Sequence, residues 1–172
     1  MKRLLDVMLS LLALLLLSPL MLATAVAIAL ETGFPVLLRQ RRVGRGGVAF
    51  GMLKFRSMVK NAAAIGPHYT SSDDPRITRV GRFIRRTSLD ELPQLLNVLR
   101  GDMSLVGPRP DVPAQRAEYS EADWTERCSV RPGITGLAQA RLRSQATPAQ
   151  RLALDLRILG WTLARLGGSG TN

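Results

Sequence analysis

The feature that most constrains this chain is an uncharged apolar stretch from Val7 to Leu30. As a straight α-helix it would be about 36 Å long, enough to cross a hydrocarbon core of roughly 30 Å. Three interpretations compete: a cleaved signal peptide, a spanning helix, or a helix that enters the bilayer, breaks and leaves on the same side. Ala25-Val26-Ala27 would suit a cleavage site, but the run is longer than the core of a typical signal peptide.

Ser18 and Pro19 stand in the middle of this stretch. Proline removes a backbone hydrogen bond and clashes with the preceding turn, so it kinks a helix. Each half is then only about 18 Å long, too short to cross, and Ser18 can bond to a carbonyl freed by the break. Basic residues on both flanks favour two cytoplasmic ends: Lys2, Arg3, Arg39, Arg41, Arg42 and Arg45. A kinked spanning helix also tolerates proline, so the residues alone leave both topologies open.

The charge balance indicates an anionic partner. The chain of 172 residues suits one domain, and its 24 Lys and Arg against 13 Asp and Glu give a net charge of +11. Nucleic acid, anionic lipid and a phosphorylated substrate all fit this balance. With one cysteine, Cys128, and one histidine, His68, an internal disulfide and a conventional zinc site are excluded.

Two adjacent carboxylates, Asp90 and Glu91, stand at the head of an expected helix. Its apolar face recurs at helical spacing, and Ser88 and Glu91 have the spacing of a capping box. Pro93 suits a first turn, where its missing N–H costs nothing, so the helix could also start at Asp90. Either start places both acids near the positive end of the helix dipole. The apolar face consists of Leu92, Leu95, Leu96 and Leu99.

Arginines surround this acid pair in the sequence. Arg85 and Arg86 lie just upstream, and Arg109 lies between two prolines in a rigid turn, Gly107-Pro108-Arg109-Pro110. A fixed guanidinium suits bidentate binding of phosphate. The pattern therefore indicates a site where charge is bound or transferred, although a helix cap beside solvated arginines fits the spacing equally well.

Two further patterns describe the rest of the domain. Val36 to Met58 predicts two short strands around the turn Gly44-Arg45-Gly46-Gly47. Arginines then recur every third residue and interleave with apolar residues, which predicts a helix at a membrane interface: Arg76, Arg79, Arg82 and Arg85. Nucleic-acid binding is a competing interpretation, but the membrane segment and the few aromatic residues favour lipid, and a solvated basic face stays open.

Three blocks closely resemble the bacterial sugar transferases, which are monotopic phosphoglycosyl transferases. They are DDPRITRVGRFIRRTSLDELPQLLNVLRGDMSLVGPRP (residues 73–110), KFRSM (54–58) and RPGITGLAQ (131–139). The start KRLLDV and the central Ser-Pro also match, so the resemblance covers residues 1 to about 155.

The resemblance implies a reaction. Such enzymes transfer a sugar phosphate from a UDP-sugar to polyprenyl (undecaprenyl) phosphate and release UMP, as the first membrane step of exopolysaccharide, capsule, O-antigen or glycoprotein glycan synthesis. It implies Asp90 as the nucleophile of a covalent phosphosugar intermediate, Glu91 as a Mg²⁺ ligand, and Arg85 and Arg109 as phosphate-binding residues. It also implies a re-entrant helix broken at Ser18-Pro19, in the bacterial inner membrane, with the catalytic domain on the cytoplasmic face.

The expected fold is α+β and mostly helical. It has a re-entrant helix-break-helix in residues 1–34 and a small catalytic domain in 35–172, with interfacial amphipathic helices and a short β-hairpin. The tail looks shortened relative to the family, so Asp155 is a weak site candidate, and a homodimer stays open. The alternative function is a non-catalytic membrane-surface module that binds anionic lipids or a partner. Nucleic acid is not an expected partner.

Overall fold

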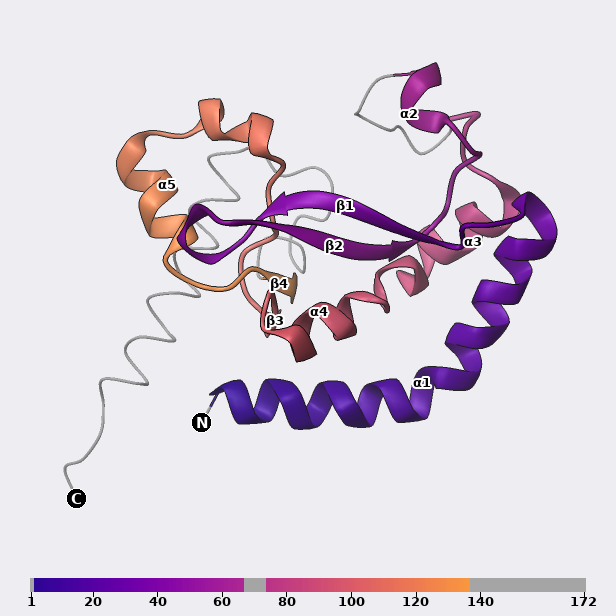
Figure 1. Cartoon of the computed structure of the whole chain (residues 1–172), viewed down its shortest axis with the longest axis horizontal. Helices are drawn as coiled ribbons and strands as arrows, with labels where there is room; N and C mark the ends of the chain where they lie inside the picture. The colour runs from indigo at the N-terminus through magenta and orange to yellow at the C-terminus, as the bar shows by residue number, and fades with distance from the viewer. Residues whose placement is uncertain (1, 67–73, 137–172) are drawn as a thin grey trace.

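The computed structural model describes residues 2–66 and 74–136, so the candidate Asp155 lies outside the described residues. Within them the fold is mixed α/β and includes the expected long apolar helix and β-hairpin (Figure 1). The elements are α1 (Lys2–Thr32), β1 (Leu37–Val43), η1 (Arg45–Gly47), β2 (Ala49–Phe55), α2 (Ala62–Ile65), α3 (Arg79–Arg86), η2 (Leu89–Glu91), α4 (Gln94–Arg100), β3 (Ser104–Val106), η3 (Pro113–Glu118), α5 (Glu121–Cys128) and β4 (Gly133–Thr135).

Helix α1 contains Pro19 and changes direction part-way along its length (Figure 1). Because Pro19 has no N–H, it cannot bond to the carbonyl of Leu15, four residues earlier. The hydroxyl of Ser18 donates to that carbonyl instead, at 2.8 Å. The sequence predicted a break in the helix and a hydrogen bond from Ser18 to a carbonyl freed by it. The structure has that hydrogen bond, but the helix is bent and continues on both sides of Pro19.

The N-terminal end of α1 is fastened to the folded domain. Arg3 donates to the carbonyls of Val98 (2.6 Å) and Leu99 (3.0 Å), in the last turn of α4. Asp6 is buried and accepts a hydrogen bond from the hydroxyl of Ser104, on β3, at 2.8 Å. A cation at the C-terminal end of α4 also complements the helix dipole.

The C-terminal end of α1 returns to the same domain. The carboxylate of Glu31 accepts from the backbone N–H groups of Arg79 (2.8 Å) and Val80 (3.1 Å) at the start of α3. The guanidinium of Arg56, just after β2, donates to the side chain of Thr32. Both ends of the apolar helix therefore lie against one body of protein.

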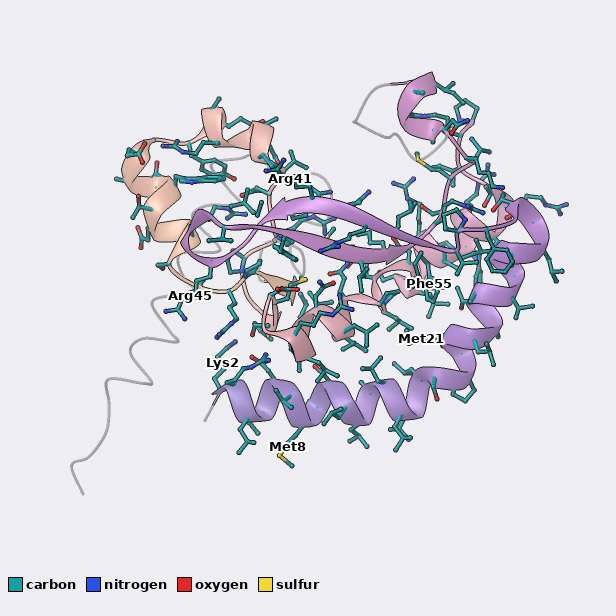
Figure 2. The ribbon with its side chains drawn as sticks, in the orientation of Figure 1. Lys2, Met8, Met21, Arg41, Arg45 and Phe55 are labelled. Atoms are coloured by element: carbon teal, nitrogen blue, oxygen red, sulfur yellow. The ribbon has the colours of Figure 1, made fainter. Side chains whose placement is uncertain are left out.

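The apolar side chains of α1 divide between two faces. Met8 points away from the domain and is 58% exposed, whereas Met21 packs against a core cluster (Figure 2). Most of the leucines on the outer face remain uncovered by protein. This helix is long and apolar enough to cross a membrane by length and composition.

Strands β1 and β2 form the expected antiparallel hairpin, with Leu37 opposite Phe55 and Val43 opposite Ala49. The turn between them contains Gly46 (φ 68°) and Gly47 (φ 76°). Side chains rarely adopt such positive φ values, so the glycine cluster is what allows the tight reversal. The predicted hairpin is confirmed.

Strand β2 is shared by two hydrophobic clusters. The first joins α1, β2 and α3 through Ile28, Phe55 and Ile84, and the second joins β2 to α4 and the segment after it through Met52, Val98 and Met103. The fully buried amide of Asn97 adds polar contacts between α4 and the strand. It accepts from the N–H of Leu53 and donates to the carbonyl of Gly51, each at 2.9 Å.

Strands β3 and β4 pair in parallel, with Ser104 beside Gly133 and Val106 beside Thr135. A Cβ on Gly133 would lie 2.1 Å from the backbone nitrogen of Gly107, so only glycine permits this approach. The contact brings the proline-rich turn at 107–110 beside the segment from residue 131.

One arginine of the predicted ridge, Arg76, lies outside helix α3. Arg76 is not helical: it is buried and pairs with Asp74 at 2.6 Å. Thr78 then caps the helix by accepting from the N–H of Gly81. The predicted ridge included one arginine too many. Arg76 pairs with Asp74, two positions upstream, and the regular spacing of the arginines does not reveal this ion pair. The exposed face of α3 carries Arg79, Arg82, Phe83, Arg85 and Arg86.

Candidate active site

The acid pair lies in a short 3₁₀ turn, η2, and not in the first turn of a helix. Ser88 adopts a left-handed conformation (φ 58°) and makes no capping bond with its side chain. Instead, its carbonyl accepts from the backbone N–H of Glu91 at 3.2 Å. Helix α4 begins at Gln94, with Pro93 as its cap. The predicted capping box is wrong because the chain turns at Ser88 directly after α3, which takes the hydroxyl out of capping geometry.

Lys54, on β2, bridges the two acids. Its ammonium lies 2.8 Å from Oε1 of Glu91 and 3.7 Å from Oδ2 of Asp90. All three side chains are largely shielded, with 14%, 20% and 12% of their surfaces exposed for Lys54, Glu91 and Asp90. Lys54 was not predicted as a site residue. The available signal was a lysine between Leu53 and Phe55, inside an apolar strand and at the start of the KFRSM block.

The two carboxyl groups have opposite pKa shifts. Burial raises the pKa of Asp90, although the charges of Lys54 and Arg85 oppose this. Burial also acts to raise the pKa of Glu91, but the charges of Lys54 and Arg109 and the hydrogen bond from Lys54 outweigh it, so the net shift is downward. Adjacent acids whose pKa values are pushed apart are suited to different roles.

Arg109 faces Glu91 from the proline-rich turn, with its Nη1 atom 3.7 Å from Oε1 of the acid. A buried ion pair holds this turn: Arg127 of α5 contacts Asp111 at 2.5 Å and donates to the carbonyl of Arg109 at 2.8 Å. The backbone at Arg109 is thus fixed, while its side chain stays 44% exposed. Arg127 and Asp111 were also missed, because their pairing joins segments 16 residues apart.

Arg85 lies at the margin of the site. It occupies the exposed last turn of α3 and acts on Asp90 through its charge, lowering the pKa of that acid. The structure therefore brings Asp90, Glu91 and Arg109 together and leaves Arg85 near them. Ser18 and Pro19 belong to the bend of α1.

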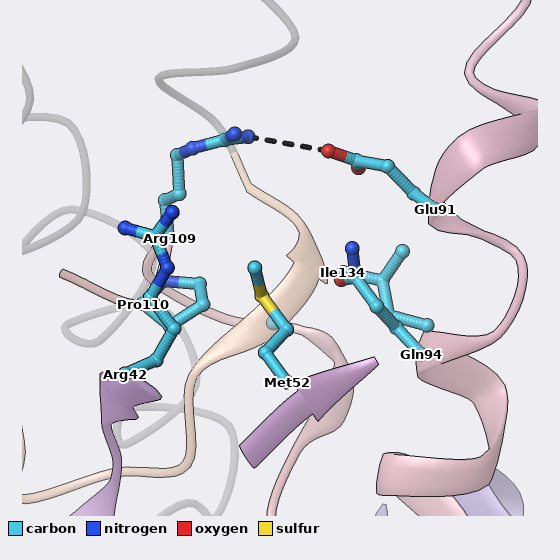
Figure 3. A pocket seen from close by; sticks show the side chains of 8 residues that line it. Arg42, Met52, Glu91, Gln94, Arg109, Pro110 and Ile134 are labelled. Atoms are coloured by element: carbon cyan, nitrogen blue, oxygen red, sulfur yellow. Dashed lines mark ion pairs between the residues drawn. The ribbon is translucent and has the colours of Figure 1, made fainter. Parts of the chain in front are cut away.

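Glu91 and Arg109 form an ion pair at 3.7 Å, and both line a small hollow that is open to solvent (Figure 3). Strand β1 contributes Arg42 to its wall, and the side chain of Arg42 lies beside the segment that carries Arg109 (Figure 3). The hollow is lined by Arg42, Met52, Glu91, Gln94, Arg109, Pro110, Gly133 and Ile134.

The donor set around the hollow suits a hard cation that keeps most of its own ligands. Among residues 2–66 and 74–136 there is no group of three acidic, histidine or cysteine side chains that would form a protein cage. Mg²⁺ is commonly held by one or two carboxylates together with water and substrate phosphates. Asp90 and Glu91 fit that pattern, and the contacts from Lys54 and Arg109 both fall on Oε1 of Glu91.

The sequence profile of the family described as "Bacterial sugar transferase" matches residues 1–164. The chain belongs to this family. The match includes the apolar helix, the hairpin and the acid pair, so the candidate active site lies inside the region that defines a bacterial sugar transferase.

Three curated relatives of this bacterial sugar transferase illustrate the family. The UDP-glucose:undecaprenyl-phosphate glucose-1-phosphate transferase of Caulobacter vibrioides is 47% identical over 174 residues, which cover 95% of this chain and 64% of the relative. The UDP-N-acetylgalactosamine-undecaprenyl-phosphate N-acetylgalactosaminephosphotransferase of Aeromonas hydrophila is 48% identical, covering 80% and 33%. The exopolysaccharide production protein PSS of Rhizobium leguminosarum is 46% identical, covering 92% and 85%. The chain thus spans under two thirds of the first two relatives.

Proposed function

We propose that this bacterial sugar transferase moves a sugar phosphate from a UDP-sugar to polyprenyl phosphate and releases UMP. The names of the Caulobacter and Aeromonas relatives describe transfers of this kind. The observation that carries the proposal is the shielded pair Asp90 and Glu91, bridged by Lys54, with Arg109 paired to Glu91 beside an open hollow. Such an arrangement offers a nucleophile together with fixed cations for phosphate.

In the first half-reaction, a carboxylate oxygen of Asp90 attacks the sugar-bearing phosphorus of the UDP-sugar. A bond forms between the Asp90 oxygen and this phosphorus. The bond from the phosphorus to the bridging oxygen of the diphosphate breaks, and UMP leaves with that oxygen and the electron pair. In the second, an oxygen of polyprenyl phosphate attacks the same phosphorus and Asp90 departs as a carboxylate. Splitting one difficult transfer into two steps is the usual advantage of a covalent intermediate.

The neighbours of Asp90 divide the remaining tasks. The charge of Lys54 favours the ionised form of both acids, and Arg109 binds the diphosphate with its planar guanidinium. Glu91, with a lowered pKa, stays ionised and would hold Mg²⁺ together with the diphosphate oxygens. When bound, the metal neutralises charge on the transferring phosphoryl group. Arg85 adds positive charge at the margin of the site.

The acceptor is a lipid, and α1 supplies the membrane attachment. We assign it a re-entrant topology, because the N-terminal contacts of Arg3 and Asp6 and the C-terminal contacts of Glu31 and Thr32 all reach one domain. A spanning helix would place those ends on opposite sides of the bilayer. The basic flanks favour the cytoplasmic side for both, which would put the site on the cytoplasmic face of the inner membrane.

The exposed surface of α3 extends this attachment. Phe83 is 52% exposed, and arginines surround it on the helix. An apolar side chain flanked by guanidinium groups suits the boundary between acyl chains and anionic headgroups. The proposed lipid contact therefore comprises the outer face of α1 and the exposed face of α3.

Intact-protein mass spectrometry tests the covalent step. Purified protein is mixed with UDP-glucose, UDP-galactose or UDP-N-acetylgalactosamine and Mg²⁺, without polyprenyl phosphate, and adducts are mapped by peptide analysis. We expect a sugar-phosphate adduct on Asp90 and release of UMP. Asp90→Asn should abolish both, whereas the control Asp123→Asn, on α5, should retain them. Turnover by Asp90→Asn, or an adduct on another residue, would reject the mechanism.

Glu91→Gln tests the division of roles between the acids. We expect it to weaken the Mg²⁺ dependence and to lower turnover while leaving the nucleophile in place. Its matched control is Glu126→Gln, an exposed position on α5. A Mg²⁺ titration unchanged from wild type would remove Glu91 from the proposed metal site.

Cysteine labelling tests the topology. In a Cys128→Ala background, one reporter cysteine precedes Met1 and another replaces Val48, which is 69% exposed in the hairpin turn region. We expect a membrane-impermeant maleimide to label neither in intact cells and both after lysis. Labelling of the N-terminal reporter alone in intact cells would establish a spanning helix and refute the re-entrant assignment.

A further inference from the structure

The side chain of Arg42 reaches the hollow from β1, beside the segment that carries Arg109 (Figure 3). One of its terminal nitrogens donates to the side chain of Gln40 at 3.2 Å. Its Nε atom is buried, and within the described part of the chain it has no hydrogen-bond partner. A buried donor without a partner is costly, so this position carries a guanidinium at the expense of stability.

The charges around Arg42 are unbalanced. It faces Arg109 and the two carboxylates Asp111 and Glu91. Both carboxylates have closer cationic partners, since Arg127 lies 2.5 Å from Asp111 and Lys54 lies 2.8 Å from Glu91. Burial lowers the pKa of Arg42, and the charge of Arg109 lowers it further, against the opposing effect of the two acids.

Two arginine side chains that line one hollow, one of them with a buried Nε atom that has no partner among the described residues, suit an anion. Each presents a planar set of donors that matches phosphate oxygens. A bound phosphate would satisfy the Nε atom of Arg42 and would offset the repulsion between the two cations. The wall of the hollow that carries Arg42 lies on β1, apart from η2, which carries the acids.

We infer that Arg42 and Arg109 form a subsite for the phosphate that is not attached to Asp90. This rests on the proposed function and assigns a role to a residue outside the acid pair. The subsite holds the phosphate of UMP as it departs in the first half-reaction. It then holds the phosphate of the polyprenyl acceptor in the second.

The geometry of phosphoryl transfer explains why UMP and the acceptor would use the same phosphate subsite. Attacking and leaving oxygens lie roughly in line across the phosphorus. Asp90 attacks from one side and UMP leaves from the other. When Asp90 becomes the leaving group, the acceptor must attack from the side that UMP vacated. One phosphate subsite opposite Asp90 therefore serves both half-reactions, and UMP and the acceptor cannot occupy it together.

Three variants test this inference. Arg42→Gln removes the charge, Arg42→Lys keeps the charge without the planar donors, and Arg41→Gln is the control. Arg41 is the neighbouring arginine on the same strand, exposed and on the opposite face of the hairpin (Figure 2). UMP and uridine, which lacks the phosphate, are titrated into each variant by calorimetry, and thermal unfolding is recorded for each.

We expect Arg42→Gln to raise the Kd of UMP by about 10- to 100-fold and to leave uridine binding unchanged. Arg42→Lys should lie between this variant and wild type, and Arg41→Gln should match wild type. The Tm of Arg42→Gln should be unchanged or higher, because a poorly satisfied buried donor has been removed. Equal losses for UMP and uridine, or unchanged UMP binding, would overturn the inference.

The half-reactions distinguish the two sources of phosphate. With UDP-glucose, adduct formation and UMP release report the first, and discharge of the adduct by undecaprenyl phosphate reports the second. We expect Arg42→Gln to slow both, and UMP to compete with undecaprenyl phosphate in discharge. Normal discharge by Arg42→Gln would overturn the shared subsite. A wild-type protein that forms no adduct with any UDP-sugar would reject the proposed function, while the UMP titration would still test the subsite.

Discussion

Replacing Lys54 by methionine should separate the electrostatic role of the lysine from its space-filling role. Methionine has a similar length and no charge, so the packing of β2 is largely retained. The change removes the cation that lies 2.8 Å from Glu91 and 3.7 Å from Asp90. Two adjacent, shielded carboxylates would then lack their shared cation, with Arg109 at 3.7 Å from Glu91 as the remaining ion-pair partner in the described part of the site.

The size of the effect follows from the distance to Asp90. At 3.7 Å and an effective dielectric constant near 20, two unit charges interact by about 4 kcal/mol, an upper limit beside a hollow open to water. Loss of such a partner commonly moves a carboxyl pKa upward by about one to three units. The acidic limb of the rate profile should shift upward by a similar amount, because in the proposed mechanism only ionised Asp90 attacks.

The free energy of unfolding provides a second test, because its change with pH has an expected direction. In the wild type, the lowered pKa of Glu91 contributes stability that is present above its unfolded pKa and is lost as pH falls through its folded pKa. In Lys54→Met, both acids are buried without that cation, so the variant should lose about 3–5 kcal/mol near neutral pH. The deficit should shrink as pH falls, because protonation removes the unpaired charges.

The assay combines UMP release across pH with urea unfolding in detergent at pH 5 and pH 7.5. Lys60→Met, at an exposed position, is the control and should match wild type in both. The reasoning is refuted if the acidic limb of Lys54→Met does not move, or if the loss of stability is equal at both pH values. Either result would mean that Lys54 acts through packing and not through its charge.

Three further changes have defined outcomes. Arg109→Lys keeps the charge but loses the planar donors, so turnover in the UMP assay should fall by at least about tenfold with Tm unchanged; near-wild-type turnover would make Arg109 a solvated residue. Asn97→Ala removes the buried amide that joins α4 to β2 and should cost about 2–3 kcal/mol in urea unfolding; a loss below 1 kcal/mol would contradict that role. Pro19→Ala restores an N–H to the carbonyl of Leu15 and should straighten α1, raising the spanning fraction in the labelling assay; an unchanged fraction would argue that the domain contacts alone set the topology.

Features set by neighbouring residues were accessible from the sequence. The hairpin followed from glycines between two apolar runs, and the hydrogen bond from Ser18 followed from the N–H that Pro19 lacks. Arg109 was expected in a fixed turn because prolines flank it, and it lies there. In each case the deciding interaction spans only a few residues, so a local pattern is sufficient.

Features set by distant contacts were not accessible. Lys54 reaches the acid pair across 37 positions of sequence, and Arg127 reaches Asp111 across 16. The wrong capping box has the same origin, since Ser88 is constrained by the turn out of α3 and not by the helix that follows. The ion pair Asp74–Arg76 was missed for a different reason. It is local, but Arg76 also fitted the regular spacing of the arginines and was therefore assigned to the helix.

The position of α1 relates the candidate active site to the proposed lipid acceptor. Helix α4 packs on α1, and packed helices lie about 8–10 Å apart. The acid pair stands in η2, immediately before α4, so it belongs to the segment that leads into the helix packed on α1. With the proposed topology, the outer leucines of α1 occupy the acyl region, and η2 comes to the level of the headgroups. Polyprenyl phosphate carries its reactive group at that level, so the acceptor can meet Asp90 while its chain stays in the membrane. A bent helix fastened at both ends therefore fixes the height of the active site, which a single spanning helix joined to the domain at one end would not do.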